Sequence, residues 1–356
     1  MDVKVVIGSN YGDECKGLVA GVLGEMNPGR ILTINYNGCQ QRAHTYKDHI
    51  FHCTGVNDAN GGDTFYHRQF VIDPIALWLT RERVIIDPRC RIILPCDVMK
   101  NRNLEKSRGD KRHGSCGMGL FACVTRSKEK PLLAADLLLD PYTLYNKVKE
   151  LNQYYPYNED DGLYTLGHFM QAVEYLNREC ETIPFEALMD ENRYDHLIYE
   201  GGQGLLLDQL NRGDFPHLKP PSVSAQNIHE DIEKLNLPTE LYYVSRTYMT
   251  RHGAGPMEAE CAKEDINPDI VDTTNQANPW QGALRFGHLY LPSLYKRIQA
   301  DAARYNLDKK VNLVFTHTNY TDGKLDTTEG RIDIEKPDFA SHLYTSSRKD
   351  YMEKVA

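Results

Sequence analysis

The sequence predicts an α/β fold with a large, mostly parallel central sheet that helices cover. Two observations support this prediction. Short runs rich in β-forming residues recur along the chain, and most are apolar throughout, which is typical of buried parallel strands. Segments with helical periodicity lie between these runs, and such alternation places helices on both faces of a parallel sheet.

The expected elements follow in chain order. Strands are predicted at 3–8, 30–37, 83–88, 91–95, 196–201, 240–248 and 311–319. Helices are predicted at 15–26, 163–180 and 291–305. The stretch 97–160 is rich in charge, glycine and tyrosine, and we interpret it as an insertion or helical subdomain inside one domain that spans 1–356.

Composition excludes several classes of protein. With 356 residues, of which 41% are hydrophobic, the chain can bury a sizeable core. Its net charge of −9 argues against a nucleic-acid-binding protein, and without a run of 18 apolar residues no membrane span is expected. The nine cysteines show no C-x-x-C spacing, and no signal peptide is evident, so a reduced, cytoplasmic protein is expected.

Unusual polar segments follow five of the predicted strands. They are "GSNYGDECKG" (8–17), "NGCQQRAHT" (37–45), "EGGQGLLLD" (200–208), "TYMTRHGAGP" (247–256) and "THTN" (316–319). In parallel sheets, ligands bind beyond the carboxyl ends of the strands. The repeated placement therefore predicts one composite active site at that edge.

The first of these segments carries more charge than a strand-to-helix turn requires. Gly12 and Gly17 let backbone N–H groups turn inward as an anion nest, and Lys16 adds a positive charge for phosphate. Asp13 suits Mg²⁺ binding or proton transfer, since it would repel a phosphate. The alternative is an ordinary capped turn with a solvated acid and lysine. His44 and Gln203 likewise permit structural roles.

Taken together and in this order, the motifs resemble the adenylosuccinate synthetase family. The resemblance runs from residue 3 to about 350, and its most specific parts are "GDECKG", "YEGGQGLLLD" and "YMTRHGAGP". It implies a fold similar to the P-loop nucleoside triphosphatases and a homodimer with shared active sites. It also implies a carbon–nitrogen ligase that uses Mg²⁺, a nucleoside triphosphate and L-aspartate. The triphosphate phosphorylates O6 of a purine nucleotide, and the aspartate amine then displaces the phosphate.

The resemblance assigns roles to individual residues. Asp13 matches the base that removes the N1 proton, and Lys16 and His44 match the groups that stabilise the transferred phosphoryl group. The predicted contacts to the purine nucleotide are Asp13, Gln41, Ser115, Cys116, Arg126, Gln203, Leu207, Lys219, His252 and Gly253, of which Arg126 matches an arginine that reaches across the dimer. The predicted contacts to aspartate are Thr273, Thr274 and Arg285. The predicted contacts to the triphosphate are Gly12, Glu14, Cys15, Lys16, Gly17, Leu18, Ala43, His44, Thr45, Thr318, Asn319, Ser346 and Ser347, and the predicted Mg²⁺ ligands are Asp13 and Ala43.

One departure from the family pattern concerns the triphosphate. The family has "T-K-x-D" after its late strand, and the aspartate accepts two N–H bonds from guanine. Here His317 and Asn319 stand in place of the lysine and the acid. An amide both donates and accepts, which suits an adenine edge, so we expect ATP or dATP. The alternative is a diverged strand end whose donor is still GTP.

Further departures concern the nucleotide and aspartate. The arginine-rich aspartate loop retains only Arg285, the family's asparagine is Gln41, its glycine is Ala43, and Lys219 replaces a threonine. These changes resemble the viral branch of the family, which acts on dGMP to make the precursor of 2-aminoadenine deoxynucleotide; the enzyme would then work in the host cytoplasm. Some viral members have serine at the position of Asp13, which this chain keeps. The alternatives are a synthetase acting on IMP with GTP, and a nucleotide-binding protein without catalysis.

Overall fold

The computed structural model describes the whole chain except residues 158–161, 221, 273–274, 276–281 and 305–308. Its centre is a ten-stranded sheet with the order β19-β18-β15-β11-β1-β10-β2-β5-β7-β9. Neighbouring strands run parallel except at the edge, where β19 pairs antiparallel with β18. The prediction of a large, mostly parallel sheet is therefore confirmed.

The middle of this sheet is formed by long strands, whereas the strands toward either edge are shorter. In sheet order, the strands are β19 (Glu353–Lys354), β18 (His342–Ser346), β15 (Lys309–Thr316), β11 (Thr239–Arg246), β1 (Asp2–Gly8), β10 (His196–Gly204), β2 (Ile31–Asn35), β5 (Asp63–Tyr66), β7 (Ile85–Ile86) and β9 (Glu181–Thr182).

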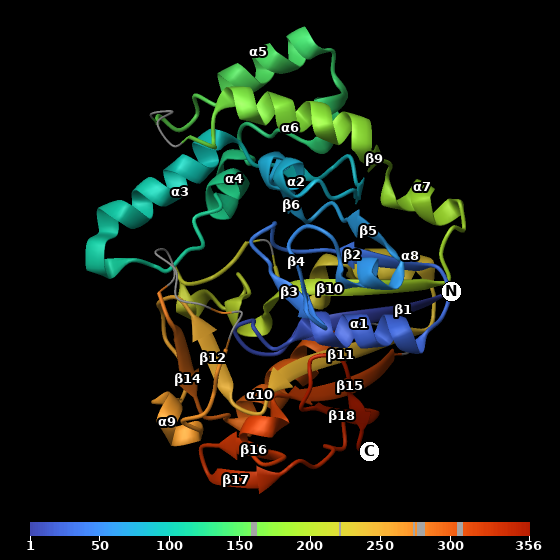
Figure 1. Cartoon of the computed structure of the whole chain (residues 1–356), viewed down its shortest axis with the longest axis vertical. Coiled ribbons are helices and arrows are strands. Elements are labelled where there is room, and N and C mark those ends of the chain that lie inside the picture. Colours follow the sequence, from blue (N-terminus) through green and yellow to red (C-terminus); the bar gives the residue numbers. More distant parts are fainter. Residues whose placement is uncertain (158–161, 221, 273–274, 276–281, 305–308) are drawn as a thin grey trace.

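Helices cover both faces of the sheet, as Figure 1 shows. Helix α1 (Lys16–Met26) packs on one face, where Val6 of β1 and Val244 of β11 meet its apolar side chains. Helices α7 (Phe185–Asp190), α8 (His229–Leu235) and α10 (Leu291–Ala302) pack on the other face, against Val5 and Ile7 of β1. Because alternate residues of β1 point to opposite faces and both faces are buried, the strand is apolar throughout.

A helical region lies beside the β5–β7 side of the sheet and contains a second hydrophobic core. Its helices are α2 (Pro74–Thr80), α3 (Pro95–Arg108), α4 (Leu120–Arg126), α5 (Pro141–Leu151) and α6 (Leu166–Glu179). The stretch 97–160, predicted as an insertion, supplies most of α3 together with α4 and α5. Helix α6 continues the same layer, because its buried face (Phe169, Val173 and Leu176) packs into this core.

Four small sheets complete the described structure. They are β12 (Met249–His252) with β14 (Leu284–Gly287) and β13 (Glu260–Cys261), β3 (His44–Tyr46) with β4 (His49–Phe51), β6 (Val71–Ile72) with β8 (Arg91–Ile92), and β16 (Lys324–Thr327) with β17 (Gly330–Asp333). A short helix, α9 (Lys263–Ile266), lies near β14.

The structure corrects one predicted strand and adds several others. The run 91–95 was expected as a strand, but it contributes only β8, which pairs with β6 outside the main sheet. Strands β5 and β18 belong to the main sheet and were not predicted. Their sequences, "DTFY" and "HLYTS", are short and mix polar with apolar residues, so the signal of a buried parallel strand is weak.

Candidate active site

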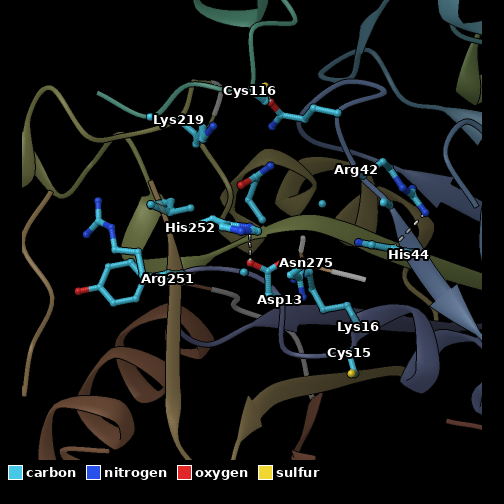
Figure 2. Close-up of a pocket in the computed structure, with 18 of the residues that line it drawn as sticks. Asp13, Cys15, Lys16, Arg42, His44, Cys116, Lys219, Arg251, His252 and Asn275 are labelled. Carbon is cyan, nitrogen blue, oxygen red and sulfur yellow. Dashed lines mark hydrogen bonds and ion pairs between the residues drawn. The ribbon is translucent and has the colours of Figure 1, made fainter. Parts of the chain in front are cut away.

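The polar segments that follow the strands surround one cavity of about 830 Å³. Its wall combines the turn after β1, the segment 41–45, the loop 113–116, the end of β10, the turn after β12 and the segment after β15. The cavity therefore lies at the carboxyl edge of the sheet, where the sequence predicts a composite active site. Figure 2 shows these side chains converging from different elements.

The turn between β1 and α1 is held together by Glu14. The backbone N–H groups of Asn10 and Gly12 both donate to Glu14 Oε1 at 2.9 Å, and Lys16 Nζ donates to Glu14 Oε2 at 2.9 Å. The carboxylate of Glu14 and the ammonium of Lys16 are both buried. The inward-facing N–H groups of Asn10 and Gly12 are thus already paired with an internal carboxylate.

Asp13 and Cys15, on either side of Glu14, adopt left-handed backbone conformations with φ of 58° and 67°. This kink turns the Asp13 side chain toward the cavity while Glu14 points into the turn. Gly17 lets the start of α1 approach closely, since a Cβ there would lie 2.9 Å from the Cβ of His44. The carboxylate of Asp13 and the imidazole of His44 are therefore presented from elements in direct contact.

The Asp13 carboxylate faces a histidine across the cavity. Its Oδ2 lies 3.7 Å from His252 Nδ1, at the end of β12, as Figure 2 shows. Burial raises the pKa of Asp13, and the nearby charges of His252, Arg246 and Lys16 oppose this rise. A carboxylate with a raised pKa is a stronger base than an ordinary aspartate, which suits proton abstraction.

His44 belongs to a second acid–histidine pair. Its Nδ1 contacts Glu200 Oε1, and Arg42 Nη2 lies 2.9 Å from Glu200 Oε2. Burial raises the pKa of Glu200, but the charges of Arg42 and His44 outweigh this effect and hold it at about 2. Burial and the adjacent Arg42 lower the pKa of His44 to about 4. We therefore describe this group as an Arg42–Glu200 ion pair with a neutral imidazole beside it.

Arg246 connects the first turn to a neighbouring strand. It ends β11, and its Nε donates to the backbone oxygen of Asp13 at 2.6 Å while Nη2 donates to Asp272 at 2.8 Å. Its third contact is Tyr248, at 3.2 Å. Because the guanidinium is buried and bonded on three sides, it fixes the backbone that carries Asp13.

One side of the cavity has polar groups without protein partners. Among the described residues, buried atoms that lack a hydrogen-bond partner include Gln41 Nε2, His217 Nδ1, Arg251 Nε and His252 Nε2, and all four residues line the cavity. Buried polar atoms are normally satisfied, and these atoms, with Arg42 Nε, belong to residues of the cavity lining. Cys116 Sγ and Gln41 Oε1 are 2.6 Å apart on the same wall.

The loop 113–116 is held at this wall by a close backbone contact. A Cβ on Gly114 would lie 2.5 Å from the Cα of Gly253, and one on Gly253 would lie 2.8 Å from the carbonyl oxygen of Gly114. Both glycines also have positive φ, so a side chain at either position would be strained. Gly253 therefore positions the loop that carries Ser115, whose hydroxyl exchanges hydrogen bonds with Asn101.

The opposite end of the cavity is bordered by aromatic and polar residues. His317 and Tyr320 stack with ring centroids 6.2 Å apart, and Asn319 between them is exposed. Ser347 lies on the same wall. Burial and the adjacent Arg246 hold the pKa of His317 well below its usual range, so its ring is neutral.

Most of the predicted site residues line this cavity. They are Gly12, Asp13, Cys15, Lys16, Gly17, Leu18, Gln41, Ala43, His44, Thr45, Ser115, Cys116, Gln203, Leu207, Lys219, His252, Asn319 and Ser347. Six others do not form its wall, namely Glu14, Arg126, Gly253, Arg285, Thr318 and Ser346. Arg285 instead pairs with Glu260 beside the turn 253–255. Thr273 and Thr274 lie outside the described residues.

The placement of Arg126 does not support its predicted role. Its side chain is fully buried in the helical region, where Nη2 lies 2.8 Å from Asp97 and 2.9 Å from the backbone oxygen of Ile92. Nη1 donates to the backbone oxygen of Lys130 at 2.7 Å. With its donors used inside the protomer, this guanidinium cannot reach a neighbouring subunit's ligand from here.

Sequence reasoning missed several residues of the site. Arg42, Arg246, Asp272 and Asn275 line the cavity, and Glu200 supports His44 from behind. Arg251 also lines it, and the sequence offers this residue as either an anion contact or a structural cap. Glu200 and Arg246 could have been found, since each ends or nearly ends a predicted strand whose next residues were already singled out. Asp272 offers no such signal, because only the folded chain brings it to Arg246.

The residues present are compatible with a magnesium ion held partly by substrate. No group of three or more His, Cys, Asp and Glu side chains arranged to hold a metal occurs among the described residues. The Asp13 carboxylate and the main chain at Ala43 both border the cavity and supply oxygen atoms. Mg²⁺ is commonly bound through one or two carboxylates together with phosphates and water, so this donor set fits.

Comparison with known proteins decides the family. The family model described as adenylosuccinate synthetase matches residues 71–289, more than half of the chain. The chain belongs to the adenylosuccinate synthetase family. It is therefore an aspartate ligase that forms a carbon–nitrogen bond, in a family that binds a purine nucleotide, aspartate and a nucleoside triphosphate and depends on Mg²⁺.

Relatives and solved structures agree with this assignment. An adenylosuccinate synthetase from Pseudoalteromonas translucida is 27% identical over 315 residues, covering 79% of this chain and 70% of the relative. One from Clostridium botulinum is 26% identical over 303 residues, covering 74% of this chain and 67% of the relative.

None of the described helices combines the length and apolar character that crossing a membrane needs.

Two solved structures share the fold. The fully ligated adenylosuccinate synthetase from Plasmodium falciparum superposes with a TM-score of 0.70 and 17% identity, covering 99% of this chain and 87% of that one. The succinoaminodeoxyadenylate synthetase of cyanophage S-2L, bound to dGMP and dATP as an energy donor, gives 0.64 and 15%, covering 99% and 95%. At these identities the likeness shows the fold alone.

Proposed function

We propose that this enzyme joins L-aspartate to C6 of dGMP and uses ATP or dATP as the phosphoryl donor. The products are the succinylated 2-amino-2′-deoxyadenylate, ADP or dADP, and phosphate. A homodimer acting in the cytoplasm, of a host cell if the protein is viral, belongs to the same proposal.

The observation that carries the choice of donor is Asn319. Its side chain is exposed at one end of the cavity, beside the stacked rings of His317 and Tyr320. A carboxylate there would accept both N–H groups of guanine, whereas an amide presents one donor and one acceptor. That pair complements an adenine edge. The neutral state of His317 also suits stacking against an uncharged base.

The choice of nucleotide rests on two further observations. The cyanophage enzyme with the same fold is bound to dGMP and dATP in its solved structure. In addition, Gln41 and Lys219, which depart from the family pattern, both line the cavity. Since the acid Asp13 is kept while the surroundings differ, the changes affect recognition of the nucleotide and leave the chemistry in place.

Asp13 begins the reaction in this proposal. It removes the proton from N1 of the purine, and the electron pair of the N1–H bond makes O6 nucleophilic. O6 then attacks the terminal phosphorus of the triphosphate, the bond to the bridging oxygen breaks, and ADP or dADP leaves. In the second step the aspartate amine attacks C6, the C6–O6 bond breaks, and phosphate departs with O6. When bound, Mg²⁺ neutralises phosphate charge.

His44 and Lys16 stabilise the charge that develops during transfer. His44 Nδ1 faces Glu200, which leaves Nε2 for the cavity side. An arriving triphosphate is strongly negative and raises the pKa of a nearby imidazole, so protonated His44 can donate from Nε2. Lys16 must exchange Glu14 for phosphate to contribute its charge.

A second candidate function has its own support. The relatives compared above are named adenylosuccinate synthetase and are 26–27% identical to this chain, which favours IMP with GTP. This chain retains Asp13 and His44, and these residues suit either reaction equally. Each reaction requires removal of the N1 proton and stabilisation of the 6-phosphoryl group. A binding protein without catalysis would need neither residue.

The test is initial-rate phosphate release with L-aspartate and Mg²⁺, crossing IMP, GMP and dGMP against GTP, ATP and dATP. The proposal predicts the highest kcat/KM for dGMP with an adenine triphosphate. Turnover confined to IMP with GTP would establish the second candidate. Absence of aspartate-dependent release with every pair would identify a binding protein.

A further inference from the structure

Asp272 is an acidic residue of the cavity wall to which the reaction described above gives no role. Its side chain is 12% exposed, and its Oδ2 lies 2.8 Å from Arg246 Nη2. Asn275 donates to the same carboxylate twice, from its backbone N–H to Oδ1 at 2.9 Å and from Nδ2 to Oδ2 at 2.8 Å. The acid is therefore held in place on one side and holds a guanidinium on the other.

Arg246 connects this acid to the turn after β1. Its Nε donates to the backbone oxygen of Asp13 at 2.6 Å, while Nη2 is the nitrogen that bonds Asp272. Only 3% of the arginine side chain is exposed, and the ring of Tyr248 lies 5.7 Å from its Cζ. Because a guanidinium is planar and rigid, it cannot rotate without breaking one of these two bonds.

The backbone at Asp13 requires such a restraint. Its φ of 58° is a left-handed conformation that residues other than glycine seldom adopt, and such conformations persist only where the surrounding structure holds them. The preceding Gly12 has a φ of 98°, and a Cβ there would meet nothing within 4 Å, so packing does not restrain that residue. The bond from Arg246 therefore holds the carbonyl of Asp13 and, with it, the direction of the side chain.

We propose that Asp272 is a positioning residue for the base: through Arg246 it fixes the backbone that directs the Asp13 carboxylate into the cavity. The inference rests on the role of Asp13 in the proposed function, but not on which nucleotide is the substrate. Without Asp272, the guanidinium would be buried without its charged partner and would leave its position. Asp13 would then be misplaced, and a displacement of about 1 Å costs on the order of 10²-fold in rate.

The experiment measures steady-state phosphate release with the nucleotide and triphosphate that the wild type turns over fastest. The variants are Asp272→Ala, which removes the carboxylate, and Asp272→Asn, whose side-chain oxygen keeps one acceptor for Arg246. Asp97→Ala is the matched control, because Asp97 Oδ2 also lies 2.8 Å from a buried arginine, Arg126, but in the helical region and outside the cavity wall. Calorimetric titration with the same nucleotide gives the fraction of binding-competent sites in each variant.

For Asp272→Ala we expect kcat per binding-competent site to fall about 10- to 100-fold, while KM for the nucleotide and the triphosphate changes little. Asp272→Asn should recover part of kcat. Asp97→Ala should lower the unfolding temperature and keep the wild-type kcat per competent site. If either alanine variant does not fold, Asp272→Asn read against Asp97→Asn makes the same comparison.

The variant Arg246→Lys tests whether Asp272 acts through the arginine. A lysine keeps the positive charge, but its single ammonium group cannot bond Asp13 and Asp272 from two separate nitrogens. If the arginine carries the effect, adding Asp272→Ala to Arg246→Lys should change kcat by less than about 2-fold, because residues that act as one unit are not additive. Losses that multiply in full would overturn the proposal.

The remaining outcomes separate this inference from the proposed function. An active wild type together with an Asp272→Ala variant of the same kcat per competent site would overturn the role of Asp272 alone. A loss confined to KM for L-aspartate would do the same, since Asp272 would then act on that substrate. A wild type without aspartate-dependent phosphate release would overturn the proposed function, and this inference with it.

Discussion

The cavity holds two acid–histidine pairs that differ in how completely they are satisfied. Glu200 and His44 are in contact, and Arg42 bonds the same carboxylate, so the charges of this group are matched within the protein, and among its side-chain nitrogens and oxygens in the described structure only Arg42 Nε is buried without a partner. Asp13 and His252 stand 3.7 Å apart, and one nitrogen of the histidine has no partner among the described residues. Both pairs lie at the carboxyl edge of the sheet.

This difference indicates different roles: the Glu200–His44 pair supports the structure of the site, whereas the Asp13–His252 pair is available to a ligand. A buried carboxylate paired with arginine has a fixed charge and a fixed position, so it can orient the histidine beside it. In a pair that is held more loosely, polar atoms remain available to a ligand, and the pKa values of the pair change when the ligand binds. We therefore expect substitutions in the Glu200–His44 pair to lower the free energy of unfolding. Substitutions in the Asp13–His252 pair should instead change turnover and substrate selectivity.

The largest expected effect is on turnover when Asp13→Asn removes the base. Loss of general-base catalysis typically costs 10²–10⁴-fold, so kcat should fall by roughly 10³-fold. Nucleotide binding, measured by calorimetry, should remain. Asp190→Asn, at the exposed end of α7, serves as the control and should leave kcat unchanged. Near-normal turnover of the Asp13 variant would show that another group removes the proton.

The next effect is on the free energy of unfolding when Glu200→Gln breaks the supported pair. The change leaves the buried guanidinium of Arg42 without its charge partner, which costs about 3 kcal/mol. Chemical denaturation measures this loss. Glu150→Gln provides the contrast, because its partner Lys130, 2.8 Å away, is exposed, and it should cost much less. Equal losses would contradict the distinction drawn between the pairs.

Lowering the pH should reduce the free energy of unfolding through the Glu200–His44 pair, without any substitution. The folded-state pKa of His44 is lowered to about 4, so the unfolded chain binds the extra proton more readily, and stability falls as pH drops below the unfolded value of about 6.5. Glu200 has a folded pKa of about 2, so its contribution is lost as pH falls from about 4.3 toward 2.

The unfolding free energy measured between pH 7 and 4 should therefore decline by on the order of 1–3 kcal/mol through His44. In a His44→Gln variant, this part of the pH dependence should disappear. A variant with the wild-type slope would mean that other groups cause it.

The smallest expected effect is on donor choice at the far end of the cavity, where neither pair reaches. Asn319→Asp should raise kcat/KM for GTP relative to ATP by about 10-fold, since one recovered base contact is worth ~1–3 kcal/mol. Asn319→Ser tests the loss of the amide alone, because it should lower kcat/KM for ATP without raising kcat/KM for GTP. An unchanged preference in the aspartate variant would remove the argument for an adenine donor.

Residues adjacent in sequence to strand ends could be predicted, because the parallel sheet brings all such ends to one edge. Asp13, His44, Gln203 and Asn319 were found in this way, and all four line the cavity. Asp272 and Asn275 could not be found, since only tertiary folding brings their segment to the turn after β1. Arg126 shows the opposite failure, because a basic residue in a motif-like context turned out to be buried beside Asp97.

The strand predictions succeeded and failed for a related reason. Runs that are buried on both faces, such as β1, are apolar throughout and are easily recognised. Toward the edge of the sheet, β5 and β9 were not predicted and form only short ladders with their neighbours, so packing and not local sequence defines them.

The carboxylate of Glu14 has a consequence for free anions. It accepts N–H groups of Asn10 and Gly12 and bonds Lys16, which are the groups that a phosphate would use. Being tethered to the same turn, it competes at a high effective concentration. Inorganic phosphate, which brings no other contacts, is then a weak competitor in the resting enzyme. In the proposed function, a nucleoside triphosphate displaces Glu14 because contacts of its base and sugar elsewhere in the cavity add to its affinity.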